Sequence, residues 1–211
     1  MAEHATMSWI TLFALGAFHG VNPAMGWLFA VALGMQERRS NAVWRAMLPL
    51  GAGHGLAVAA AVLVAILAGA ILPMNLLRWS VAAILVLFGI THLVRHRHPA
   101  WARMRVGMGQ LTLWSFLMAS AHGAGLMVVP VFLGMTMAAA HGSHPMSASA
   151  HTATALVATL LHAAGYLLVT AVVAFLVFKK LGVAVLRKTW FNLDLLWGIA
   201  LAGSGVATAL L

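Results

Sequence analysis

Long apolar stretches, interrupted by short polar segments, dominate the sequence. Apolar residues lie on every side of each expected helix instead of forming one stripe, a pattern typical of helices surrounded by lipid or by other helices. Each stretch has at least the roughly 20 residues needed to cross a bilayer. The pattern predicts six transmembrane helices, over residues 8–35, 44–72, 75–95, 107–139, 153–178 and 189–211.

Two of the stretches contain a proline that is expected to disturb the helix. Pro23 has no N–H, so it removes the hydrogen bond that would reach the carbonyl of His19, four residues earlier. We therefore expect an opened turn with a free His19 carbonyl. The stretch 107–139 is long for one span, which predicts a helix that is tilted or broken near Pro130.

The composition excludes a soluble protein. Hydrophobic residues make up 63% of the 211 residues, charged residues make up 7%, and the mean hydropathy is +0.99. Soluble domains carry about 25% charged residues. The net charge of +9 does not indicate nucleic acid binding, because the Lys and Arg residues form short clusters between apolar stretches. We expect a single integral membrane domain over residues 1–211, with the lipid bilayer as its partner, and the oligomeric state stays open.

The distribution of positive charge predicts the orientation. Eleven of the twelve Lys and Arg residues fall in or beside the first, third and fifth connections, and only Arg78 lies near the opposite side. Positive residues gather on the cytoplasmic side of membrane proteins. The sequence therefore predicts a multi-pass protein of the inner (plasma) membrane, with both termini and the histidine-rich loop 141–151 on the non-cytoplasmic side.

An internal repeat relates the two halves of the chain. His19-Gly20 in the first helix corresponds to His122-Gly123 in the fourth, and His54 in the second helix corresponds to His162 in the fifth. The halves, about 8–95 and 107–211, contain three expected helices each, so the second must be inverted relative to the first. The predicted fold is all-α, with six transmembrane helices in a 3+3 inverted repeat, an architecture common in transporters.

The four repeat-related histidines are the strongest candidates for a site. His19, His54, His122 and His162 are expected near mid-membrane, where ionisable residues are costly and commonly functional. The alternative is that each histidine simply bonds to a neighbouring helix. The chain has no cysteine and only three acidic residues, which argues against thiolate ligands and paired carboxylates. We expect the four imidazoles to form one metal site.

Further residues are expected to support this site or to control access to it. At the turn opened by Pro23, Asn22 and the freed His19 carbonyl would form a polar pocket, and the alternative is a simple kink. Met25 is a candidate thioether ligand, and the alternative is a side chain that fills the core. His92 and Asp194 are expected near the cytoplasmic ends of the third and sixth helices. They are candidates for a gate or proton relay, and the alternative is an interfacial ion pair of Asp194 with a nearby cation.

The segment His19-Gly20-Val21-Asn22-Pro23-Ala24-Met25 resembles the His-x-x-Asp-Pro-Asp-His signature of nickel/cobalt transporters of the NicO type, within the lysine-exporter superfamily. Gly53-His54-Gly55-Leu56-Ala57-Val58 is similar to the Gly-His-Ser-Leu-Thr-Val segment of that family. The resemblance covers about fifty residues and implies six helices in two repeats. His19, Pro23 and His54 match the motif, whereas Asn22, Ala24 and Met25 replace its two aspartates and final histidine.

Three functions remain open from the sequence. The leading one is transport of a transition-metal ion (zinc, copper, nickel, cobalt or iron) by alternating access around the histidines, which favours a protein without enzymatic activity and leaves that question open. Imidazole suits these metals, and protonation would release them. The alternatives are a membrane redox protein or metalloenzyme that holds a fixed metal or haem, and a channel or carrier for a small neutral or organic molecule.

Overall fold

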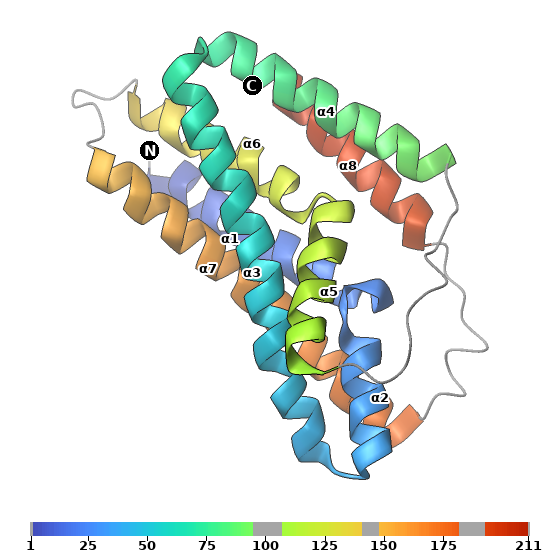
Figure 1. Ribbon diagram of the computed structural model, residues 1–211. Helices are drawn as coiled ribbons and strands as arrows, with labels where there is room; N and C mark the ends of the chain where they lie inside the picture. The colour runs from blue at the N-terminus through green and yellow to red at the C-terminus, as the bar shows by residue number, and fades with distance from the viewer. Residues whose placement is uncertain (1, 95–106, 141–147, 182–192, 211) are drawn as a thin grey trace.

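The computed structural model describes residues 2–94, 107–140, 148–181 and 193–210 (Figure 1). Within these ranges the chain forms eight α-helices and two short helical turns, with no strand. The elements are α1 (Ala2–Val21), η1 (Pro23–Met25), α2 (Trp27–Glu37), α3 (Ser40–Ile71), α4 (Met74–Val94), α5 (Met108–Ala121), α6 (Ala124–Ala140), α7 (Ala148–Leu176), η2 (Val177–Leu181) and α8 (Leu193–Leu210). The all-helical prediction is confirmed.

The helix lengths agree in part with the predicted spans. Three helices of the described chain are long and apolar enough to cross a membrane, over Ser40–Ile71, Met74–Thr91 and Ser149–Lys180. A fourth results if the bent pair Met108–Ala121 and Ala124–Thr136 is one span. Thr6–Val21 and Trp197–Leu210 are apolar but shorter.

The first predicted break is confirmed at Pro23. The chain leaves α1, forms the 3-10 turn η1, and continues as α2 after Gly26, whose φ of 129° disfavours other residues. The side-chain oxygen of Asn22 accepts a hydrogen bond from the N–H of Ala24 at 3.0 Å and caps the turn. The expectation of a free His19 carbonyl is wrong, because the tightened turn lets the N–H of Asn22 donate to this carbonyl at 3.2 Å.

The second break lies elsewhere than predicted. α5 ends before His122, and α6 begins after Gly123 at an angle of 60° to α5. Gly123 has a φ of +69°, which glycine adopts without the strain of a Cβ. The prediction of a disturbance near Pro130 is wrong about the place of this break. Pro130 lies inside the continuous helix α6, where only one backbone hydrogen bond is lost.

The same order of elements occurs twice along the chain. A broken helix (α1–α2), a long helix (α3) and a shorter helix (α4) are followed by a broken helix (α5–α6), a long helix (α7) and a shorter helix (α8). α1 packs on α7, α5 packs on α3, α3 crosses α7, and α4 pairs with α8. In Figure 1, α3 runs from the bottom of the view to the top, whereas α7 runs from the upper left towards the bottom.

The outward faces of the long helices are strongly apolar. Leu56, Leu63 and Leu67 on α3 are all more than half exposed, as are Leu160 and Leu168 on α7. Soluble monomers rarely expose contiguous apolar surface of this extent. The inward faces carry glycines at points of helix contact, where the helices approach one another closely.

Candidate functional site

Three of the four predicted histidines meet in the interior. His19 lies near the end of α1, His54 lies in the middle of α3, and His162 lies in the middle of α7. The ring centres are 5.0 Å apart for His19 and His162, 5.3 Å for His54 and His162, and 5.6 Å for His19 and His54. All three side chains are completely buried. We call these three residues the histidine cluster.

Close packing between α1 and α7 allows this convergence. A Cβ added at Gly16 would overlap the carbonyl oxygen of His162, and a Cβ added at Gly165 would lie 3.0 Å from the amide nitrogen of Ala17. The two helix backbones are therefore in direct contact at the level of the cluster. Only residues without a side chain allow imidazoles from both helices to reach one another here.

Backbone carbonyls fix the tautomer of two rings in the cluster. Nδ1 of His19 lies 2.6 Å from the carbonyl oxygen of Leu15, and Nδ1 of His162 lies 3.2 Å from that of Leu12. A carbonyl oxygen can only accept a hydrogen bond, so Nδ1 carries the proton in both rings. Their Nε2 atoms are buried without a hydrogen-bond partner, as are both ring nitrogens of His54. Each neutral ring thus has one nitrogen lone pair to which no protein group donates a hydrogen bond.

Trp197 of α8 contacts both His122 and His19 of the histidine cluster. The Trp197 ring centre is 4.5 Å from that of His19 and 5.6 Å from that of His122. Its indole N–H donates to the carbonyl of His122 at 2.6 Å. Nδ1 of His122 lies 2.9 Å from the carbonyl oxygen of Met118, which repeats the bond of His19 to the residue four positions earlier.

Tyr166 lies directly on the histidine cluster. Its ring stacks on His54 with centres 3.9 Å apart and planes within 8° of parallel. Its hydroxyl donates to the carbonyl of Met25 in η1 at 2.6 Å, and the side chain is fully buried. The break of the first helix is therefore joined to the cluster through Tyr166.

The three supporting residues have separate roles. Asn22 caps η1, and its amide nitrogen is buried without a hydrogen-bond partner. Pro23 begins the turn, as predicted. The Met25 side chain is buried in an apolar cluster that also contains Trp197, while its carbonyl receives the Tyr166 hydroxyl.

The structure describes the backbone, but not the side chains, of the two residues predicted to form a gate or proton relay. His92 lies in α4 and Asp194 lies in α8. The placement of their side chains falls outside the described part of the structure.

The ring separations suit a shared ion, but the ring orientations do not. Imidazoles bound to one tetrahedral ion have centres about 5 Å apart, because each nitrogen lies about 2.0–2.1 Å from the ion. The rings of His54 and His162 are stacked within 8° of parallel, so their in-plane lone pairs cannot meet at one point. Accordingly, no group of three or more His, Cys, Asp or Glu side chains among the described residues is arranged to hold a metal ion.

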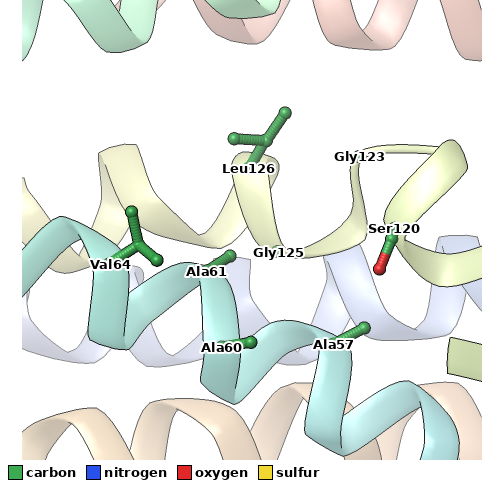
Figure 2. Close-up of a pocket in the computed structure, with 8 residues that line it drawn as sticks. All are labelled: Ala57, Ala60, Ala61, Val64, Ser120, Gly123, Gly125 and Leu126. Carbon is green, nitrogen blue, oxygen red and sulfur yellow. The ribbon is translucent and has the colours of Figure 1, made fainter. Parts of the chain in front are cut away.

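A shallow pocket of about 280 Å³ opens at the break between α5 and α6 (Figure 2). Small side chains from α3 form one wall, and the start of α6 forms the other. Its lining residues are Ala57, Ala60, Ala61, Val64, Ser120, Gly123, Gly125 and Leu126.

Sequence reasoning missed Tyr166 and Trp197, although one signal was present. Tyr166 is the only tyrosine of the chain and follows His162 by four residues, so the two side chains share a helix face. Nothing in the sequence distinguishes Trp197 from the seven other tryptophans. Comparisons with protein families, with curated proteins and with solved structures find no match to this chain.

Proposed function

We propose that this protein is a membrane transporter for a transition-metal ion that passes through the histidine cluster. The observation that carries the proposal is the meeting of three fully buried imidazoles, from three different helices, whose free ring nitrogens lack any protein partner. Buried polar atoms without partners cost free energy. A cation that binds them for part of a cycle explains their retention.

A membrane location is supported by the outer surface and the charge distribution. Exposed leucines cover α3 and α7, and the cationic residues lie almost entirely at alternate connections. Together they favour a multi-pass protein of the inner (plasma) membrane, with both termini non-cytoplasmic.

The repeated order of elements supports six spans in a 3+3 inverted repeat. In each half the first helix ends within three residues of a histidine: α1 ends close to His19, and α5 ends close to His122. The opposite directions of α3 and α7 also agree with inversion (Figure 1). Transporters with this architecture bind their substrates at broken helices between the repeats.

The fixed tautomers favour a cation as the substrate. Metal-binding histidines generally donate one ring N–H to a backbone carbonyl or a carboxylate, which leaves the other nitrogen free to bind. Leu15 and Leu12 supply such carbonyls to His19 and His162. The Met118 carbonyl holds Nδ1 of His122 in the same way. A small neutral molecule would require no such arrangement.

The parallel rings favour transit over permanent binding. At least one ring must turn before His54 and His162 can bind the same ion, which suits a site that loads and empties. A haem between two histidines would separate their ring centres by about 6 Å, because both iron–nitrogen bonds of about 2 Å lie on one axis. The separation of 5.3 Å between the stacked rings is shorter than this and favours a bare ion over haem.

The donor set indicates the class of ion. Imidazole binds zinc, copper, nickel, cobalt and iron, whereas carboxylate-poor sites disfavour harder ions. The resemblance to nickel/cobalt transporters agrees with this class. Protonation of the imidazoles would release the ion and couple its movement to a proton gradient.

Transport in proteoliposomes tests the proposal. Purified protein is reconstituted with a metal-sensitive dye inside the vesicles, and uptake of Zn²⁺, Co²⁺, Ni²⁺, Cu⁺ and Fe²⁺ is measured. We expect uptake of at least one ion, reduced at least about tenfold by His54→Gln or His162→Gln. His151→Gln is the matched control, since it changes a histidine of α7 that lies three turns from the cluster, and it leaves uptake unchanged.

Two results would contradict the proposal. The first is the absence of protein-dependent uptake for every ion, and the second is uptake that His54→Gln and His162→Gln leave intact. An absorption spectrum of the purified protein separates the alternatives, because a Soret band would indicate haem and a ligand-field band would indicate a fixed coloured metal.

A further inference from the structure

We infer that Tyr166 holds His54 in an orientation that cannot bind an ion, and that it links ion binding in the histidine cluster to the broken turn of the first helix. We call this role of Tyr166 the lock. This inference rests on the proposed function and adds a positioning residue to it. Tyr166 need not bind the ion, since its effect on binding acts through the orientation of His54.

The stacking contact determines the orientation of His54. The Tyr166 ring lies 3.9 Å from the His54 ring, and the two planes are within 8° of parallel. His54 has no hydrogen bond at either nitrogen. Its orientation therefore depends on packing, and the stacked tyrosine covers one face of the ring. In this orientation His54 is parallel to His162, and the two cannot bind one ion.

The hydrogen bond of Tyr166 keeps the tyrosine in place. Its hydroxyl donates to the Met25 carbonyl at 2.6 Å, within the usual range for such a bond, and also interacts with the side chains of Ser115 and Thr170. Met25 belongs to η1, the turn that Pro23 opens between α1 and α2. A movement of this turn would withdraw the acceptor from Tyr166 and free the ring that covers His54. Conversely, rotation of His54 towards an ion would displace Tyr166 from the turn.

The contact between α1 and α7 leaves little alternative room for Tyr166. A Cβ added at Gly20 would lie 2.6 Å from the carbonyl oxygen of Tyr166, and one added at Gly16 would lie 3.0 Å from its amide nitrogen. The Tyr166 backbone is thus held against α1 over a full turn. Freedom to release His54 must come from the side chain and from η1, and the two are joined by the hydroxyl bond to the Met25 carbonyl and by packing in one apolar cluster.

Tyr166→Phe tests the lock because it removes the hydroxyl and keeps the ring. Binding of Co²⁺ to the purified full-length protein is measured by its visible absorption. We expect Tyr166→Phe to bind Co²⁺ about 2- to 12-fold more tightly than the wild type, the factor that corresponds to the net free energy of one hydrogen bond. In proteoliposomes, KM for Co²⁺ should fall while kcat does not rise. A merely structural role would weaken binding instead.

A second readout requires no metal. In protein labelled at histidine, NMR should show one sharp set of His54 ring signals in the wild type and broadened or additional signals in Tyr166→Phe. Tyr166→Leu, which also removes the stacking, should change the His54 signals further in the same direction. Thr208→Val is the matched control, because it removes a buried hydroxyl bonded at 2.6 Å to the Ser204 carbonyl in α8. It should change neither Co²⁺ binding nor the His54 signals.

The outcomes separate the two proposals. If the wild type binds and transports no metal, the proposed function fails and the lock fails with it. If the wild type binds Co²⁺ and Tyr166→Phe binds it no more tightly, only the lock is overturned. Unchanged His54 signals in both Tyr166 variants would also overturn it.

Discussion

Replacing Gly16 by alanine tests the close approach of α1 and α7 on which the histidine cluster depends. The added Cβ would overlap the His162 carbonyl oxygen and lie 2.8 Å from its carbonyl carbon. Ordinary van der Waals contact begins at 3.4 Å, so α1 must move away from α7 by at least about 0.6 Å, the difference between these distances. The atoms in the way belong to the backbone and cannot rotate aside.

The magnitude follows from two opposing effects. Alanine favours a helix over glycine by about 0.8–1.0 kcal/mol, which would stabilise the variant. Overpacking in a well-packed interior costs about 1–3 kcal/mol. Gly55→Ala is the matched control, since Gly55 also lies in a helix, next to His54, and a Cβ there meets nothing within 4 Å. The propensity gain is the same in both variants, so we expect Gly16→Ala to be less stable than Gly55→Ala by about 1–3 kcal/mol.

Thermal unfolding in detergent, followed by circular dichroism, measures this difference. For a chain of this length, 1 kcal/mol corresponds to about 2–4 °C in Tm. Gly16→Ala should therefore unfold about 2–12 °C below Gly55→Ala, which itself should match or exceed the wild type. An equal or higher Tm for Gly16→Ala would show that α1 and α7 do not touch at this level. The close packing argued for the cluster would then be refuted.

Two further predictions concern the second repeat and the topology. Trp197→Phe should lower the free energy of unfolding by about 1–3 kcal/mol in denaturation experiments, because it removes the indole donor to His122 and leaves space in the core; an unchanged stability would contradict this role. A reporter that is active only outside the cytoplasm should work when fused at Leu211 and fail when fused after Arg105; the reverse pattern would overturn the predicted orientation.

The sequence alone determined the all-helical fold and singled out the four histidines, three of which the structure brings together. Long apolar stretches can satisfy their backbone polar groups only as helices in an apolar environment, so the helical fold followed directly from the pattern. The break at Pro23 followed from its missing N–H. The choice of His19, His54, His122 and His162 followed from the cost of placing imidazoles in apolar helices.

The tertiary structure decided how these residues face one another. Helices that are apolar on every side carry no signal for the direction in which they pack. The pattern therefore could not predict that Tyr166 stacks on His54 or that Trp197 packs against His122. The second break lies at Gly123, which has a positive φ, and a proline seven residues later does not indicate that position. Ring orientation depends on contacts between residues far apart in sequence, and only the packed structure supplies those contacts.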